Sequence, residues 1–151
     1  MPIAIINNCE IYYEQQGRGP DLVLIHGESH GIEMFEQQIP EFSKDFRCLA
    51  YYRRGHGRSQ SASYGYSLVN QSHDLACLLD HLQIRRAVIV AAAMSTAIAV
   101  NYALGHPDRV RALVLAAWYE LDGFPDLEIR RKKNYGATFA EMHLDLSLIH
   151  I

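Results

Sequence analysis

Short apolar runs, separated by polar or glycine-containing stretches, recur along the first 118 residues of the chain. Four of these runs are continuous rather than alternating, which is typical of strands buried on both faces of a sheet. They are Leu22–Ile25, Arg47–Tyr52, Ala87–Val90 and Val110–Ala116. Two further β-prone runs, Ile3–Ile6 and Ile11–Gln15, flank Asn7 and Asn8 and predict a hairpin at the start of the chain.

Helical patterns separate the predicted strands. Ser67–Leu82 carries leucines at helical spacing along one face and is predicted to be an amphipathic helix. Met94–Leu104 is an alanine-rich helix, and Ile32–Lys44 is expected to be partly helical with an interruption at Pro40. Because strands alternate with helices, the sequence predicts an α/β fold with a mostly parallel, doubly wound sheet, flanking helices and right-handed crossovers.

Composition narrows the functional classes. The 151 residues are 49% hydrophobic and 21% charged, which fits one soluble globular unit. A net charge of −3 gives no reason to expect a nucleic-acid partner. The three cysteines, Cys9, Cys48 and Cys77, are widely spaced and predict free thiols instead of a disulfide framework or zinc site. No signal peptide or membrane-spanning run is visible, so we expect a cytoplasmic protein without a membrane partner.

Four motifs follow one another in a fixed order, and together they carry more information than any one alone. They are Leu24–Gly27, Arg54–Ser59, Val88–Val90 running into Ala91–Ser95, and His106–Val110. The set resembles the α/β-hydrolase superfamily over about Ile3–Trp118, especially its branch of small-molecule esterases, lactonases and haloperoxidase-like proteins. The resemblance implies an acyl-transfer enzyme without a cofactor that acts on small molecules. Tyr52 departs from the pattern, because the family usually has Asp at this position.

The resemblance also implies where an oxyanion hole forms. In the family, one backbone N–H comes from the loop after the His-Gly pair and the other from the residue after the nucleophile. These positions hold Glu28 and Met94 here, and the loop residues His26, Gly27 and Ser29 are expected to line the pocket. Such donors bind the negative oxygen of a tetrahedral intermediate.

The family's nucleophile elbow reads G-x-S-x-G, and the matching stretch is Ala91–Ser95. The spacing from the strand Val88–Val90 places Ala93 at the nucleophile position, and so does the spacing to the downstream pair His106–Pro107. A methyl group cannot attack a carbonyl, which excludes covalent catalysis by residue 93. An alternative register makes Ser95 the nucleophile, but it breaks the spacing to His106 by two residues.

The acid and the histidine of the family's triad are expected beyond the end of this chain. Glu120 and Asp122 offer an alternative position for the acid, although both suit a surface role equally well. His26 and His30 could pair on a metal ion, but no third ligand is evident, so no metal site is predicted.

We interpret residues 1–118 as part of a hydrolase core and residues 119–145 as the start of a helical cap. The last six residues, 146–151, resemble the translation of a transposon-end adapter used for sequencing libraries, so we expect a non-native tail. The alternative is an ordinary apolar C-terminal segment. On the first interpretation the chain is a fragment, and the natural protein continues past Asp145.

Three functions remain open for the parent protein. It could hydrolyse small esters or lactones, with this chain inactive because Ala93 replaces the nucleophile and the acid and histidine are missing. It could instead be a non-catalytic protein that binds a small molecule, or a lyase or cofactor-free oxygenase of the same fold. A truncated sheet leaves the strand Val110–Ala116 without its expected neighbours, which predicts self-association.

Overall fold

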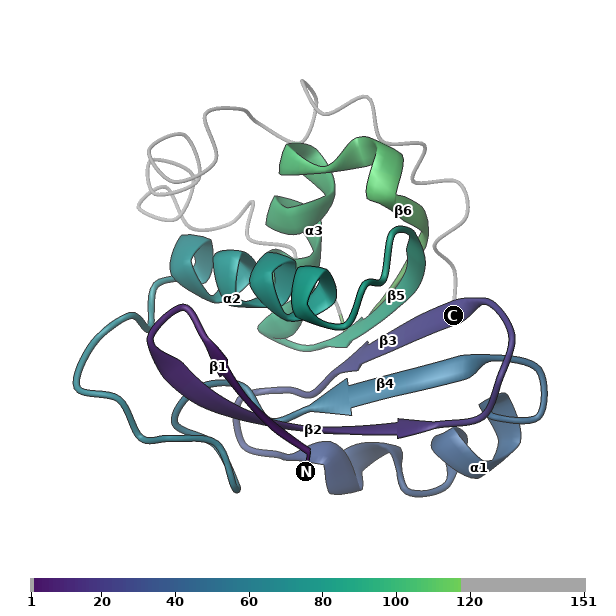
Figure 1. Cartoon of the computed structure of the whole chain (residues 1–151), viewed down its shortest axis with the longest axis horizontal. Helices are drawn as coiled ribbons and strands as arrows, with labels where there is room; N and C mark the ends of the chain where they lie inside the picture. The colour runs from purple at the N-terminus through teal and green to yellow at the C-terminus, as the bar shows by residue number, and fades with distance from the viewer. Residues whose placement is uncertain (1, 118–151) are drawn as a thin grey trace.

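The computed structural model describes residues 2–117, so the predicted cap start and the predicted tail lie outside the described residues. Six strands form one sheet in the order β1-β2-β4-β3-β5-β6 (Figure 1). Their bounds are β1 (Ile3–Ile6), β2 (Cys9–Gln16), β3 (Asp21–Ile25), β4 (Arg47–Tyr51), β5 (Ala87–Ala92) and β6 (Val110–Ala116). β4, β3, β5 and β6 are parallel, and β1 and β2 continue the sheet in antiparallel pairs. The mostly parallel sheet predicted from the sequence is confirmed.

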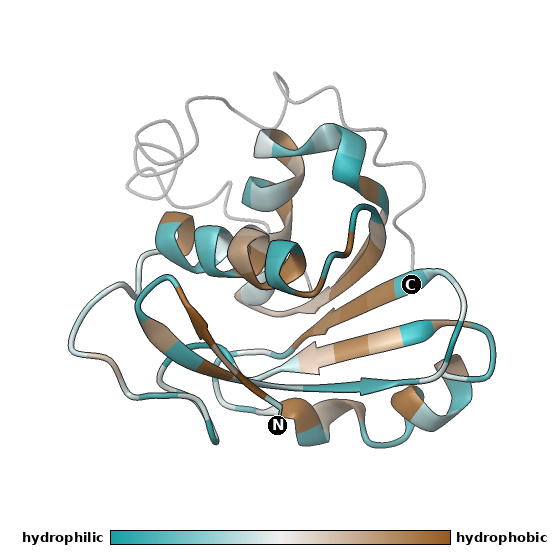
Figure 2. Ribbon diagram, viewed as in Figure 1, coloured by the Kyte–Doolittle hydropathy of each residue, from teal (hydrophilic) through white to brown (hydrophobic). Residues whose placement is uncertain are grey.

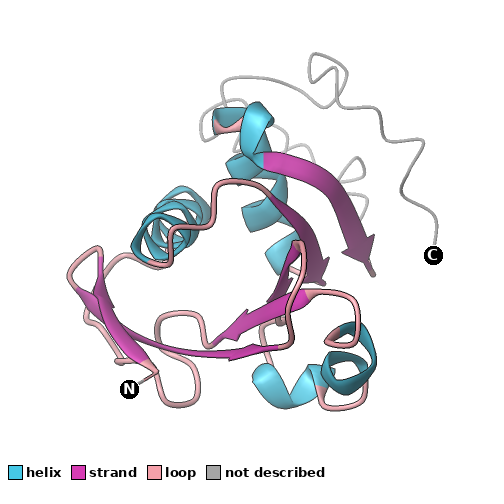
Figure 3. Ribbon diagram, turned by 45° about the vertical axis from the view of Figure 1, so that its right-hand side comes forward, coloured by secondary structure: helices cyan, strands magenta, loops and turns pink. Residues whose placement is uncertain are grey.

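Helices cover both faces of this sheet (Figure 3). α2 (Leu68–His81) and α3 (Ser95–Gly105) lie on one face, and the 3-10 helix η1 (Ile32–Phe35) and α1 (Gln38–Phe42) lie on the other. A second 3-10 helix, η2 (Pro107–Arg109), leads into β6. Among the described residues, no helix has the length and hydropathy needed to cross a bilayer.

Alternate residues of the central strands feed two separate cores. Val23 and Ile25 of β3 pack under α2 and α3, whereas Leu22 and Leu24 pack under η1 and α1. All four are buried, as the continuous apolar run predicts for a strand covered on both sides. Figure 2 shows the same concentration of hydrophobic residues in β3, β4 and β5.

The ends of the helices differ in part from the sequence prediction. Ser67 is the N-cap of α2, and its hydroxyl accepts a hydrogen bond from the Asn70 N–H at 3.2 Å, so the predicted start is one residue early. The predicted interruption at Pro40 is wrong, because Pro40 lies inside α1 and the break falls at Glu36–Gln37. Proline is tolerated in a first helical turn, where its missing N–H would have no helical acceptor.

The strand register brings three loops together at one edge of the sheet. Ile25 at the end of β3 pairs with Tyr51 of β4 on one side and with Ala91 of β5 on the other. The residues that follow these three strands are therefore neighbours in space. Strand order reverses here, since β4 and β5 flank β3 on opposite sides, and open α/β sheets bind ligands at such switch points.

Candidate functional site

A tight turn of two residues, Ala93 and Met94, joins β5 to α3. Ala93 has a φ of 50°, a left-handed conformation that costs a non-glycine residue about 1–2 kcal/mol. Its N–H donates to the Ala116 carbonyl at 2.9 Å, and its carbonyl accepts from the backbone N–H and the hydroxyl of Thr96 at 3.0 and 2.7 Å. These bonds hold Ala93 at the tip of a strand–turn–helix unit. The predicted helix start at Met94 is one residue early.

The loop that follows β3 passes directly beside this turn. A β-carbon placed on Gly27 would lie 3.4 Å from the Ala93 methyl carbon and 3.7 Å from the Ala92 carbonyl oxygen. Gly27 is buried, whereas Glu28 and Ser29 are exposed. Residue 93 therefore presents a methyl group to the loop that carries the expected oxyanion donor.

Ser95, the alternative nucleophile, is completely buried in the first turn of α3. Its hydroxyl donates to the His26 carbonyl oxygen at 2.5 Å and so ties α3 to the end of β3. In this arrangement a substrate would have no path to the hydroxyl, because the side chain has no exposed surface. The tip of the turn carries residue 93, two positions earlier.

His26 is buried, and both of its ring nitrogens are engaged within the protein. Nδ1 donates to the Gly27 carbonyl at 2.7 Å, and Nε2 accepts from the Arg53 backbone N–H at 3.1 Å. Burial lowers the pKa of His26 to about 4, and the nearby Arg53 cation acts in the same direction. The imidazole is therefore neutral at neutral pH and braces the loop from inside. With no exposed surface of its own, His26 supports the loop from inside, and the expected pocket-lining role of this loop stays a prediction.

Tyr52 occupies the position where the family pattern has Asp, and it supplies a different local contact. Its ring lies against Gly31 and Gly57, where an added β-carbon would clash with ring atoms at 2.4 and 2.3 Å. The Tyr52 hydroxyl donates to the Glu33 carboxylate, which links the loop after β4 to η1. Burial and the Glu33 charge raise the pKa of Tyr52 to about 12. Where the family pattern has an acidic side chain, this chain has a tyrosine whose hydroxyl is hydrogen-bonded to the acidic side chain of Glu33.

Two consecutive arginines after β4, Arg53 and Arg54, are both buried. Arg54 makes two charged hydrogen bonds to the Asp74 carboxylate, at 2.6 and 2.7 Å, and the side chains are 1% and 4% exposed. Asp74 also accepts from the Asn7 amide at 2.8 Å, which ties the β1–β2 turn to α2. Our sequence interpretation missed this network. A usable signal was Asp74 itself, a charged residue beside Leu75 on the apolar face of the helix.

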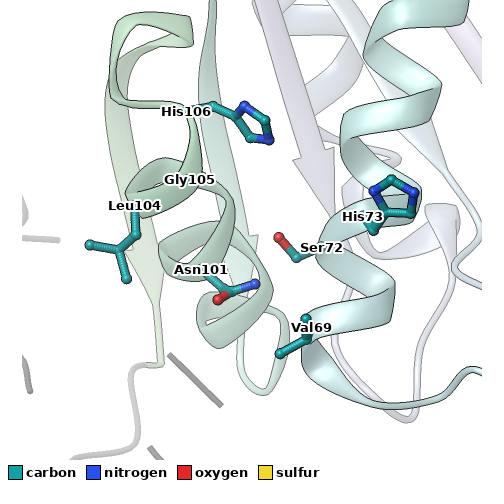
Figure 4. A pocket seen from close by; sticks show the side chains of 7 residues that line it. All are labelled: Val69, Ser72, His73, Asn101, Leu104, Gly105 and His106. Atoms are coloured by element: carbon teal, nitrogen blue, oxygen red, sulfur yellow. The ribbon is translucent and has the colours of Figure 1, made fainter. Parts of the chain in front are cut away.

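A groove of about 350 Å³ lies elsewhere, between α2 and α3 (Figure 4). It is lined by Val69, Ser72, His73, Asn101, Leu104, Gly105 and His106. None of these residues belongs to the loop at Gly27 or to the turn at Ala93. Among residues 2–117, no three His, Cys, Asp or Glu side chains lie close enough together to hold a metal ion.

A glycine at position 93 should stabilise the chain, because it would relieve the left-handed strain at the turn. We expect Ala93→Gly to raise the free energy of unfolding by about 0.5–1 kcal/mol. This is the released left-handed strain of the folded chain minus the extra conformational entropy that glycine gives the unfolded chain. Urea denaturation measures the change. Ala92→Gly, one residue earlier in β5, is the matched control and should destabilise. Destabilisation by both variants would contradict the turn geometry described above.

Comparison with known proteins agrees with this fold. A family model described as the alpha/beta hydrolase fold matches residues 20–140. The non-heme chloroperoxidase CPO-A1 of Kitasatospora aureofaciens is 31% identical over 137 residues, which are 89% of this chain and 48% of that protein. A haloalkane dehalogenase of Mesorhizobium japonicum is 30% identical over 111 residues, 74% of this chain and 36% of that protein.

The solved structure of Est816, described as an N-acyl homoserine lactone degrading enzyme, is similar with a TM-score of 0.75 and 28% identity. The match covers 88% of this chain and 52% of that one. The chain spans less than half the length of the curated relatives named above. With the sheet order, the turn at Ala93 and a family match over most of its residues, this chain belongs to the α/β-hydrolase-fold family.

Proposed function

We propose that the chain is the N-terminal half of an α/β-hydrolase-fold enzyme whose parent hydrolyses small esters or lactones, and that these 151 residues are inactive. The observation that carries the proposal is the methyl group of Ala93 at the tip of the β5–α3 turn, beside Gly27. Relatives that include a lactone-degrading enzyme support acyl transfer as the parent's chemistry.

The proposed chemistry uses two backbone N–H groups, those of Glu28 and Met94. Met94 precedes the first turn of α3, where N–H groups have no helical acceptor and the helix dipole favours negative charge. An attacking oxygen at residue 93 would add to an ester carbonyl, and the carbonyl oxygen would become the anion that these donors bind. Ala93 keeps the turn but removes the attacking atom, so the first bond of the acyl-transfer reaction cannot form.

A fluorophosphonate probe, which reacts with activated serines, tests the proposal. We expect no stoichiometric labelling of the 151-residue chain. The second protein to test is the proposed parent, expressed from a gene that continues past Asp145. In that protein, Ala93→Ser should create labelling together with hydrolysis of p-nitrophenyl acetate. Stoichiometric labelling of Ser95 in the unchanged chain would overturn both the register and the claim of inactivity.

A non-catalytic ligand-binding protein is the second candidate, because the loop at Gly27 and the turn are intact while the nucleophile is absent. The same Ala93→Ser protein separates the candidates. A binding protein would gain neither labelling nor hydrolysis. A lyase or cofactor-free oxygenase would need its acid and histidine from the part of the parent that follows these residues.

We also propose that the 151-residue chain associates with itself. β6 lies at the end of the described strand order, and Val88, Val90 and Val114 of the face under η1 are only partly buried. An edge strand beside apolar surface favours pairing between chains. Size-exclusion chromatography with light scattering should show dimers or larger species at micromolar concentration. A monodisperse monomer with a sharp cooperative melt would contradict this prediction.

The three free cysteines support a reducing compartment, so we propose a cytoplasmic location for the parent protein.

A further inference from the structure

Arg53 is a buried cation that no carboxylate among the described residues neutralises. The residue is 3% exposed, yet the ion pairs of the described region involve other residues. Its side-chain contacts within residues 2–117 are neutral: the Gln71 amide oxygen accepts from Nη1 at 2.8 Å, and the His56 ring nitrogen Nε2 lies 3.4 Å from Nη2. Burial lowers the pKa of Arg53. Burial of an unpaired charge costs desolvation free energy, which hydrogen bonds and nearby dipoles must offset.

The other end of the guanidinium reaches the loop beside residue 93. Nη2 donates to the Gly27 carbonyl oxygen at 3.2 Å, and the same oxygen accepts from His26 Nδ1 at 2.7 Å. This carbonyl belongs to the peptide unit whose N–H is that of Glu28. In a planar trans peptide the N–H points opposite to the C=O. Two donors that hold the carbonyl toward the interior therefore turn the Glu28 N–H away from Arg53 and out of the interior.

The next peptide is held as well. His56 Nε2 lies 2.8 Å from the Glu28 carbonyl oxygen and donates to it in the tautomer that carries the proton on Nε2. The same nitrogen lies 3.4 Å from Arg53 Nη2. Contacts from the Arg53–Ser59 loop thus fix both peptide units of Glu28, although the Glu28 side chain itself is exposed. A donor on a peptide carbonyl also polarises the amide, and its N–H becomes a stronger hydrogen-bond donor.

We infer that Arg53 is a positioning residue that orients and polarises the Gly27–Glu28 peptide so that the Glu28 N–H can bind a developing oxyanion beside residue 93. The inference rests on the proposed function, because it takes the Glu28 N–H as an oxyanion donor. Gln71 is suited to its part, since a neutral amide holds the guanidinium in place and leaves its charge free to act on the peptide.

A thiol at position 93 allows the test on the chain as it exists, because a thiolate at a helix N-terminus needs no histidine to react. In an Ala93→Cys variant that also carries Cys77→Ser, the sulfur attacks p-nitrophenyl acetate, the tetrahedral oxyanion forms and collapses, and nitrophenolate leaves a thioester. Iodoacetamide alkylates the same thiolate by displacement of iodide, without an oxyanion. The ratio of the acylation rate to the alkylation rate therefore measures oxyanion stabilisation alone, with peptide mapping to locate each product.

Arg53→Gln should lower this ratio about tenfold, less than the hundredfold or more that follows loss of a direct oxyanion donor. Gln71→Glu should lower it while Arg53 stays in place, because a carboxylate would cancel the charge. Asn101→Gln, in the distant groove, is the control and should change nothing. Arg53→Lys keeps the charge and serves as a second variant should Arg53→Gln not fold.

The outcomes distinguish failure of the proposed function from failure of the role of Arg53 alone. An Ala93→Cys chain whose ratio is no higher than that of a small thiol such as N-acetylcysteine would refute the oxyanion hole, and with it the proposed function. A raised ratio that Arg53→Gln, Arg53→Lys and Gln71→Glu all leave unchanged would overturn the role of Arg53 alone. A loss with Arg53→Gln and Gln71→Glu, but not with Arg53→Lys, supports the inference in full.

Discussion

Replacement of Asp74 by asparagine is expected to remove about 3–5 kcal/mol of folding free energy, a large part of the roughly 5–15 kcal/mol that stabilises an ordinary domain. The reason is the position of Arg54, whose guanidinium is 1% exposed and depends on both Asp74 oxygens. An asparagine would present an NH₂ group to one of the two guanidinium donors, so one Arg54 donor would lose its acceptor in a place that water does not reach. Urea denaturation monitored by circular dichroism measures the loss.

A second ion pair of the chain provides the matched control for Asp74→Asn. Arg109 contacts Asp80 at 2.7 Å, but the Asp80 side chain is 66% exposed. Exposed pairs contribute about 0–1 kcal/mol, because water solvates both charges once they separate. Asp80→Asn should therefore change the unfolding free energy by less than about 1 kcal/mol. Equal effects of Asp74→Asn and Asp80→Asn would show that Arg54 reaches solvent.

The chain is expected to lose about 3 kcal/mol of stability through His26 alone as the pH falls from about 6.5 to about 4. Burial holds the pKa of His26 at about 4 in the folded chain, below its ordinary value of 6.5. Within this window the unfolded chain binds a proton that the folded chain does not, so acid favours unfolding. Above the window both states are neutral, and below it both are protonated, so the His26 contribution is constant at either end.

A comparison with His26→Gln isolates this contribution, because the carboxylates that titrate in the same range are common to both proteins. The glutamine variant should show a shallower fall of unfolding free energy between pH 6.5 and pH 4. His81→Gln serves as the control at an exposed histidine near the end of α2. If His26→Gln and the unchanged chain have parallel pH profiles, His26 is protonated equally in both states and is not held by the loop.

Periodicity of apolar residues was sufficient to predict the sheet, because burial on two faces leaves an unmistakable run in each central strand. Leu22–Ile25 and Val110–Ala116 lie in β3 and β6, and Ser67–Leu82 contains α2 with its cap. The ends of the elements follow less directly from this pattern. β5 continues to Ala92, two residues past the predicted end, because alanines suit a buried strand and a helix start equally well.

The polar interior of the site could not be read from the same pattern. Arg53 and Arg54 follow a strand in a glycine-rich loop, and such a sequence is usually exposed. Their burial depends on partners far away in the chain, Gln71 and Asp74 on α2. Only the strand register, which sets the loop after β4 beside the loop after β3, brings these groups together.

The central claim is that residue 93, and not residue 95, occupies the position of an attacking atom. The most direct test measures acetylation by p-nitrophenyl acetate of two variants, Ala93→Cys and Ser95→Cys, each in a Cys77→Ser background. The turn geometry and the complete burial of Ser95 predict that the thiol at position 93 reacts at least about tenfold faster. Faster acetylation at position 95 would contradict the account.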